Sequence, residues 1–428
     1  MNPSESVTRV LVPIGALGLG VDAGDVQRGI AAGAHAIACD AGSTDSGPAY
    51  LARGVAKYSR AAIKTDLKIL MKARHEAGIP LLIGSCGTSG NDKALDWTVE
   101  VALEIARELG QSPRIAVLYS EQGRQDMADA VRQGLVAPLP PMQGAEPSLF
   151  LECDHIVALM GPEPYIAALE AGADIVLGGR TTDTAVLAAM PLMRGAGAGA
   201  AWHAGKVAEC GALCSVKPRE GGVVIHVGQD GFEIEPLRPG NACTPYTVSA
   251  HMLYENSNPF HLHEPGGVLD VTQAQYEALD ERRVRVTGSV FEPRPYTMKL
   301  EGAASGGFQT VMLVGIRDRH VLGHIDRFLE KMHQVLGERV RAAMGDAAEG
   351  CHISLRPYGW NAVSGTPVPA GTPAPQEIGL LFIAYGVHTL LQPDFTAQWI
   401  SWIMLMCAFI TPFVFVAEMA LLPLSVVV

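Results

Sequence analysis

A ten-residue segment, C-D-A-G-S-T-D-S-G-P from Cys39 to Pro48, concentrates side chains that can do chemistry. Paired carboxylates suit general acid and base catalysis or a divalent cation, so we predict catalytic roles for Asp40 and Asp45. The predicted substrate ligands of this segment are its three hydroxyl residues, Ser43, Thr44 and Ser46. The alternative is a solvated turn in which aspartate and serine cap the next helix.

A second polar segment, G-G-R-T-T-D-T, spans residues 178–184. The guanidinium fork of Arg180 can bind both oxygens of a carboxylate or a phosphate. We therefore predict that Arg180 binds the substrate, together with Thr182 and Asp183. The alternative is an internal salt bridge between Arg180 and Asp183.

Two charged residues, Lys299 and Glu301, lie in an otherwise apolar run and point the same way if residues 296–301 form a strand. A charged pair in such a run needs a partner or a ligand. We predict that Lys299 binds the anionic substrate and that Glu301 transfers protons. The alternative is an interdomain salt bridge.

Histidines are concentrated between residues 251 and 263. His251 and Glu255 are one turn apart if residues 248–254 are helical, and His251 is a predicted catalytic residue. H-x-x-x-E followed by H-x-H-E at 261–264 could ligate zinc or iron, but this order matches no standard motif. We therefore predict no metal site, and the alternative for each histidine is a hydrogen bond within the core.

Two glycine-rich loops follow predicted strands. The loop G-A-L-G-L-G at 15–20 could bind a phosphate at a helix N-terminus, but it lacks the G-x-G-x-x-G spacing, so a tight strand-to-helix turn is favoured. The loop at 84–91 contains Cys86, for which the sequence identifies no base, and we do not predict a nucleophile there.

These loops fit an alternation of short apolar segments with amphipathic helices. The predicted strands are 10–14, 35–39, 80–83, 114–119, 155–160 and 174–177, and the predicted helices are 22–33, 58–77, 92–109 and 122–133. This alternation predicts a Rossmann-like α/β domain over residues 1–215, with a parallel sheet whose strand-end loops meet at one edge. Ligands bind at that edge in open sheets of this kind.

The pattern changes after residue 215. Strands at 222–227 and 232–235 flank a Q-D-G hairpin turn, and further strands at 284–291, 296–300 and 309–315 have no helices between them. With a helix at 321–340, these segments predict a second α+β domain over residues 216–356. Residues 357–376 are rich in proline and glycine, as in a stiff linker, and 377–428 form an atypical hydrophobic tail.

The tail contains 19 residues without a charge, from Trp399 to Ala417. This length meets the criterion for a transmembrane helix, so membrane anchoring through residues 399–428 is one expectation. The alternatives are a buried helix and an aberrant chain end. The N-terminus has no apolar signal segment, so the expected location of the body of the protein is cytoplasmic.

The length, net charge and cysteine spacing of the chain argue against other classes of function. A chain of 428 residues predicts two or three domains, and a net charge of -12 argues against binding to nucleic acid. The eight cysteines include no C-x-x-C pair, and their spacing suits neither a zinc ribbon nor a disulfide framework.

Five motifs together resemble the acyclic terpene utilisation (AtuA) family, from about residue 9 to about residue 382. They are D-A-G-S-T-D-S-G-P-A-Y-L, A-D-I-V-L-G-G-R-T-T-D-T-A, C-T-P-Y-T-V-S-A-H-M-L-Y-E-N-S-N-P-F-H-L-H-E-P-G-G, Y-T-M-K-L-E-G-A and G-I-R-D. Past E-I-G-L-L-F the hydrophobic tail departs from the family pattern.

The resemblance implies a bacterial enzyme of branched-acid and terpenoid catabolism that acts on a carboxylate or acyl-CoA in a lyase- or hydratase-type reaction. Coenzyme A would then enter as part of the substrate. The resemblance also implies a small ferredoxin-like partner subunit, and we expect a homo-oligomer. The alternatives are a non-catalytic binding or scaffold subunit and a membrane-tethered or truncated copy.

Overall fold

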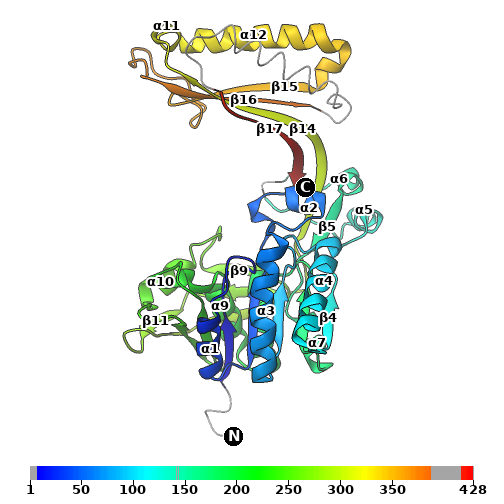
Figure 1. Ribbon diagram of the computed structural model, residues 1–428, viewed down its shortest axis with the longest axis vertical. Helices are drawn as coiled ribbons and strands as arrows, with labels where there is room; N and C mark the ends of the chain where they lie inside the picture. The colour runs from blue at the N-terminus through cyan, green and yellow to red at the C-terminus, as the bar shows by residue number, and fades with distance from the viewer. Residues whose placement is uncertain (1–6, 141, 143, 387–415, 428) are drawn as a thin grey trace. The chain divides into compact units, whose positions relative to one another are not determined.

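The computed structural model describes residues 7–140, 142, 144–386 and 416–427 (Figure 1). The chain divides into two compact units, Met1–Ala303 and Ala304–Val426. The division falls after residue 303, and not after the expected residue 215, because strands that follow residue 215 complete the sheet of the first unit.

A nine-stranded sheet in the order β11-β12-β8-β7-β1-β2-β3-β6-β4 forms the centre of the first unit. Its parallel part consists of β1 (Thr8–Val12), β2 (Ala36–Asp40), β3 (Leu81–Gly84), β6 (Ile175–Gly178) and β4 (Ile115–Leu118). Its antiparallel part consists of β7 (Val223–Val227), β8 (Gly231–Pro236), β12 (Val284–Thr287) and β11 (Gln275–Ala278). The predicted α/β class with a parallel sheet is confirmed.

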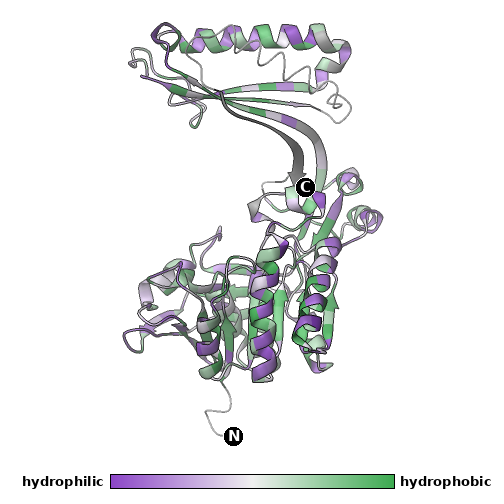
Figure 2. Cartoon of the chain, viewed as in Figure 1, coloured by the Kyte–Doolittle hydropathy of each residue, from purple (hydrophilic) through white to green (hydrophobic). Residues whose placement is uncertain are grey.

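Alternate residues of the strands belong to two separate cores. Val10 and Val12 of β1 pack with the core on one face, whereas Leu11 packs with the core on the other face. One face is covered by α1 (Ala23–Ala31), α3 (Arg60–Ala77) and α4 (Asp92–Leu109). The other is covered by α7 (Glu163–Glu170), α8 (Asp183–Met193) and α9 (Ala198–Ala208). Figure 2 shows apolar strands behind α3 and α4, whose outer sides carry polar residues.

Local signals set the limits of the long helices. Ser59 and Asn91 accept hydrogen bonds from the first turns of α3 and α4, and both helices end at a glycine in the left-handed conformation, Gly78 or Gly110. These capping residues explain why the predicted spans 58–77 and 92–109 match the structure closely.

One predicted strand of the parallel sheet is placed wrongly. β5 (His155–Ala158) lies outside the nine-stranded sheet and pairs antiparallel with the start of β14 (Leu300–Ile316). The apolar run at 155–160 does form a strand, but its partner lies far along the chain. Local periodicity carries no information on such a partner.

The remaining elements of the first unit are short. The helical ones are η2 (Thr44–Ser46), α2 (Ala49–Arg53), α5 (Arg124–Arg132), α6 (Pro147–Glu152), η3 (Gly211–Cys214) and α10 (Pro245–His251). A separate three-stranded sheet contains β13 (Val290–Pro293), β10 (Gly267–Asp270) and β9 (His261–Glu264).

The second unit is a sheet in the order β15-β16-β14-β17, with helices over one face. Its further elements are α11 (Arg319–Leu322), α12 (Ile325–Met344), η4 (Gly345–Gly350), β15 (Cys351–Tyr358), β16 (Ile378–Gly386) and β17 (Val416–Val427). Buried and less buried residues alternate along β16, which lies between β15 and β14.

The structure corrects part of the expected boundaries of the linker (357–376) and the tail (377–428). Residues 378–386 form a strand of the second unit, and residues 359–377 connect two neighbouring strands of one sheet. Most of the expected membrane segment, 399–415, lies outside the described residues. Within the described part of the chain, no helix has the length and apolarity needed to cross a bilayer.

Candidate functional site

A cavity of about 880 Å³ lies within the first unit, at the edge where the parallel strands end. Its lining includes residues 13–16 and 19–22 after β1, Asp40 at the end of β2, residues 42–43 after β2, and Thr88 after β3. Asp183 at the start of α8 and Cys210 after α9 complete one wall. The strand-end loops thus frame a cavity at the edge where the sheet topology predicts ligand binding.

Asp40 is the last residue of β2 and is only 3% exposed. Its Oδ2 atom accepts a hydrogen bond of 2.6 Å from the backbone N–H of Gly42. Burial raises the pKa of Asp40 well above its usual value, the negative charge of Asp183 raises it further, and Arg180 lowers it only in part. Asp40 therefore holds a proton more firmly than a free aspartate does.

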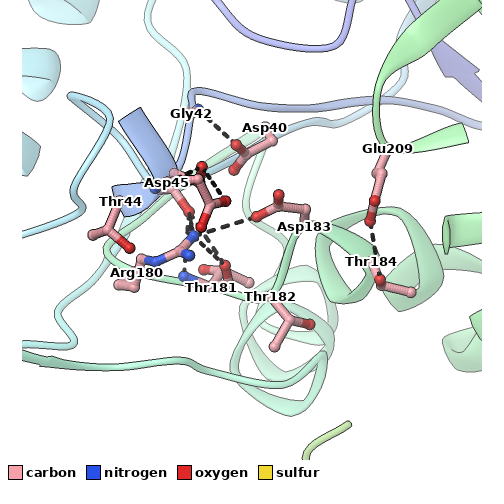
Figure 3. A network of polar contacts seen from close by, with 12 residues as sticks. Asp40, Gly42, Thr44, Asp45, Arg180, Thr181, Thr182, Asp183, Thr184 and Glu209 are labelled. Carbon is pink, nitrogen blue, oxygen red and sulfur yellow. Dashed lines mark hydrogen bonds and ion pairs between the residues drawn. The ribbon is translucent and has the colours of Figure 1, made fainter. Parts of the chain in front are cut away.

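Asp183 occupies the first turn of α8, where the helix dipole favours a negative charge. Its Oδ1 atom lies 3.3 Å from Nη1 of Arg180, and its side chain is 26% exposed because it lines the cavity. Burial of its surroundings raises the pKa of Asp183, and the charge of Arg180 opposes this rise. Figure 3 shows the carboxyl groups of Asp40 and Asp183 near the guanidinium group of Arg180.

Arg180 is 4% exposed and is absent from the cavity lining. Its Nε atom lies 3.0 Å from Oε2 of Glu301, and its Nη1 atom donates to Oγ of Ser85 at 3.0 Å and to the carbonyl oxygen of Thr181 at 3.1 Å. Its Nε and Nη1 donors are thus engaged by the protein itself. This arrangement matches the alternative of an internal ion pair, and it leaves the predicted substrate contact without geometric support.

Glu301 lies at the centre of the same network (Figure 3 shows its partners Thr44 and Arg180). The hydroxyl of Thr44 donates to Oε2 at 2.8 Å, and Nζ of the half-exposed Lys299 lies 2.8 Å from Oε1. Burial raises the pKa of Glu301, but the charges and hydrogen bonds of Arg180 and Lys299 together lower it to about 2. A carboxylate with this pKa stays ionised at neutral pH, so the geometry favours positioning of Arg180 over proton transfer.

The remaining predicted residues of the two polar segments lie in different surroundings. Ser43 lines the cavity, caps η2 and donates its hydroxyl to Oδ2 of Asp45 at 2.6 Å. Asp45 itself is exposed and is absent from the cavity lining. Thr182 caps α8 by accepting from the backbone N–H of Ala185 at 3.2 Å. The side chain of Ser46 lies outside the described residues.

The glycine-rich loop at 15–20 is a turn held by a buried carboxylate. Oδ2 of Asp66 accepts from the N–H groups of Gly18 and Gly20 at 2.8 and 3.0 Å, and Oδ1 accepts from Val21 at 2.8 Å. These N–H groups are therefore engaged and do not offer a phosphate site. Cys86 is fully buried, and burial raises the pKa of its thiol, which disfavours a nucleophilic role.

The expected helical pairing of His251 with Glu255 is wrong, because α10 ends at His251 and Glu255 adopts a left-handed backbone with φ 58°. His251 instead meets two residues from the end of α9. One ligand atom from each of Glu209, Cys210 and His251 lies within 4.8 Å of the other two. His263 is exposed on β9 and belongs to no such cluster in the described part of the chain.

Glu209 is a buried carboxyl that the sequence did not single out. Its Oε1 atom lies 2.5 Å from Nζ of the buried Lys206, and Oε2 accepts from the hydroxyl of Thr184 at 3.3 Å. Burial raises the pKa of Glu209 to about 8 against the opposing charge of Lys206. Figure 3 shows the contact with Thr184 beside the Asp183 network.

The sequence also gave no signal for the cations of the cavity, Lys57, Arg219 and Arg238, which are isolated residues in polar segments. Arg238 is held by Asp22 and Asp25 at 3.1 and 2.8 Å. Lys57 and Arg219 are exposed and form no ion pair with the described residues. They are therefore the cations of this cavity that remain available to a ligand.

Backbone strain is also found at this cavity. Thr88 and Glu255 line it and adopt positive φ values of 82° and 58°, which are uncommon for residues other than glycine. Such conformations cost free energy and persist where the surrounding structure holds them, often at functional sites.

A comparison with protein-family models identifies the family of this chain. Residues 50–349 match the family model described as "Acyclic terpene utilisation family protein AtuA". No curated protein and no solved structure matches the chain. Because the match covers most of the sequence, the chain belongs to the acyclic terpene utilisation family.

Proposed function

We propose that this protein is an enzyme that acts on a carboxylate or acyl-CoA intermediate of branched-acid or terpenoid catabolism, in a lyase- or hydratase-type reaction. The observation that supports this proposal is the cavity, which combines two carboxyl groups in unlike environments with two cations that form no ion pair with the described residues. Family membership relates the protein to acyclic terpene utilisation, and the chemistry is inferred from the site.

The two carboxyl groups suit the proton transfers of such a reaction. A lyase or hydratase removes a proton beside a carbonyl group and returns one to a leaving or accepting atom. Burial raises the pKa of Asp40 well above its usual value, whereas the charge of Asp183 is stabilised by Arg180 and by the start of α8. Groups whose environments differ in this way can serve as acid and base, so Asp40 is assigned as the acid and Asp183 as the base.

The exposed cations would bind the anionic part of the substrate. Arg219 offers a planar fork that fits a carboxylate or a phosphate, and Lys57 offers a second positive charge. A cavity of about 880 Å³ lies in the size range of small-molecule sites. In this proposal Arg219 and Lys57 replace Arg180 and Lys299 as the substrate ligands.

The experiment that tests the proposal compares Arg219→Gln with Arg107→Gln. Arg107 is an exposed arginine in the last turn of α4 that does not line the cavity, which makes it a matched control. Calorimetric titration with isovaleryl-CoA, free coenzyme A and isovalerate should show binding to the wild type. A lost charge-assisted hydrogen bond of roughly 1.5–3 kcal/mol should weaken affinity at least about tenfold in Arg219→Gln.

Two results would overturn the proposal. The first is equal affinity of Arg219→Gln and Arg107→Gln, and the second is binding of all three ligands without turnover of any acyl-CoA. The second result would favour the alternative of a binding subunit, which predicts activity only after addition of a small ferredoxin-like partner.

A further inference from the structure

We propose that Glu209, Cys210 and His251 form a divalent metal site of the zinc class in the wall of the cavity. The proposal rests on the geometry of these three side chains and does not depend on the proposed acyl-CoA chemistry. It also departs from the expectation of no metal site. That expectation rests on His251 with Glu255 and on residues 261–264, which do not form a cluster of ligand atoms in the described part of the chain.

The fold brings these residues together from two segments. Glu209 and Cys210 directly follow α9, whereas His251 is the last residue of α10. The backbone at Cys210 is held close to the loop after β1, because a Cβ atom on Gly15 would lie 2.8 Å from the carbonyl carbon and oxygen of Cys210. A Cβ atom on Gly211 would likewise lie 2.9 Å from the backbone nitrogen of Gly15. The position of Cys210 is therefore fixed by close packing.

The donor atoms are of the right kind and are close to one another. Carboxylate oxygen, thiolate sulfur and imidazole nitrogen are the three ligand types that bind zinc in proteins. The ligand atoms lie within 4.8 Å of one another. A tetrahedral zinc site with bonds of about 2.0–2.3 Å separates its ligand atoms by roughly 3.5 Å, so adjustment of about 1 Å would complete the geometry.

An independent observation at His251 points to a missing partner. The side chain is 4% exposed, yet its Nε2 atom has no hydrogen-bond partner among the described residues. Buried polar atoms are almost always hydrogen-bonded, because an unsatisfied one costs about 1–3 kcal/mol. A metal ion bound by the ring would account for a buried ring nitrogen that has no hydrogen-bond partner among the described residues.

The surrounding charges are compatible with a cation. Glu209 already contacts Lys206 through Oε1 and Thr184 through Oε2, but each carboxylate oxygen can accept more than one partner. Binding of the metal would release the thiol proton of Cys210, and any proton held by Glu209, to solvent, so that Zn²⁺, one thiolate and one carboxylate are electrically neutral together. Lys206 would then orient Glu209 from the outer shell.

Cys210 also lines the cavity, which gives the site an open side. Catalytic zinc sites use three protein ligands and leave the fourth position to water or substrate, whereas structural sites use four protein ligands. The three-residue set on a cavity wall therefore matches the open type. A carbonyl or carboxylate oxygen of a ligand in the cavity is the chemical group that this position would accept.

The test uses the full chain after removal of metals with a chelator. Titration with Zn²⁺ should show one bound ion per chain, and Co²⁺ should give the near-ultraviolet charge-transfer band of a cobalt–thiolate bond. Cys210→Ser should abolish this band, and His251→Gln should weaken affinity beyond the roughly 10- to 100-fold that loss of an outer-shell partner costs. Cys351→Ser is the matched control, because Cys351 lies in β15 of the second unit, and it should leave band and affinity unchanged.

A measurement on the wild type covers the case in which a variant fails to fold. Bound Zn²⁺ should protect Cys210 from alkylation by iodoacetamide, as read by peptide mass spectrometry, while Cys351 reacts equally with and without the metal. Unchanged Co²⁺ affinity in folded Cys210→Ser, or alkylation of Cys210 at the same rate with and without Zn²⁺, would overturn the proposal. Because no acyl-CoA is present, failure of the metal site and failure of the proposed function are distinguishable.

Discussion

The Nε atom of Arg180 lies 3.0 Å from Oε2 of Glu301, and both side chains are at least 94% buried. The pair joins the loop after β6 to the start of β14, two segments of the first unit that are 121 residues apart in sequence. Nη1 of the same guanidinium group reaches Asp183 on the cavity wall. The ion pair therefore fixes the position of a cavity carboxylate from outside the cavity.

Glu301→Gln should destabilise the first unit strongly, because it leaves the charge of Arg180 buried with one fewer carboxylate. Removal of one member of a buried ion pair costs about 3–5 kcal/mol, reduced here by the remaining contact with Asp183. The measurement is the melting temperature of the unit that contains this pair. Lys299→Gln is the control, because an exposed partner contributes less than about 1 kcal/mol. Equal melting temperatures of the two variants would contradict the structural role of the pair.

Asp40→Asn should preserve the fold and abolish turnover. Burial raises the pKa of Asp40 and so favours its neutral form, which asparagine resembles, and the amide oxygen of asparagine can still accept from the N–H of Gly42. Loss of a positioned acid should lower turnover by roughly 10²–10⁴-fold. Thermal melting and turnover are measured together, with Asp45→Asn as the control, because Asp45 is exposed outside the cavity lining. Full activity of Asp40→Asn would exclude the proposed acid.

The sequence predicts the parallel part of the fold because its signals are local. The helix over Asp92–Leu109 follows from a capping asparagine, a terminal glycine and apolar residues at helical spacing. The pairing of β5 with β14 has no such signal, because it joins residues that are far apart in the chain. Buried and less buried residues do alternate along β16, but an apolar tail follows the strand directly in the sequence. A domain boundary drawn from composition therefore assigns β16 to that tail.

The candidate site is predictable only in part. Asp40 and Asp183 are found from polar loops after strands, and the topology places both at one cavity. The sequence around Arg180 suggests a ligand-binding residue, but its guanidinium group forms an ion pair with Glu301. No sequence motif specifies this partner. Arg219 and Glu209 belong to no recognisable pattern, because their roles arise from three-dimensional proximity alone.

Because of His203, the free energy of unfolding of the first unit should decrease as the pH falls below 6.5. Its ring is fully buried between the hydroxyls of Ser289 and Tyr276 at 2.7 and 3.2 Å, and burial lowers its pKa to about 3. The unfolded chain then binds a proton that the folded chain does not, so stability is present above pH 6.5 and is lost as pH falls towards 3. The expected slope is about 1.4 kcal/mol per pH unit.

Urea unfolding of the wild type and His203→Gln at several pH values between 6.5 and 4 measures this slope. The variant starts from lower stability, but it should lose less stability per pH unit than the wild type. Other buried groups contribute equally to both proteins, so the difference isolates His203. Parallel pH profiles would show that His203 is protonated in the folded state.

A chain that ends at Pro375 should lose the fold of the second unit, whereas a chain that ends at Gly386 should retain β14, β15 and β16 paired. The shorter chain lacks β16, and β15 pairs with no other described strand. It also lacks four buried core residues, Ile378, Leu380, Phe382 and Ala384. Hydrogen exchange measured by mass spectrometry should show unprotected β15 amides in the shorter chain and protected ones in the longer chain. Protection of β15 in both would mean that another segment replaces β16.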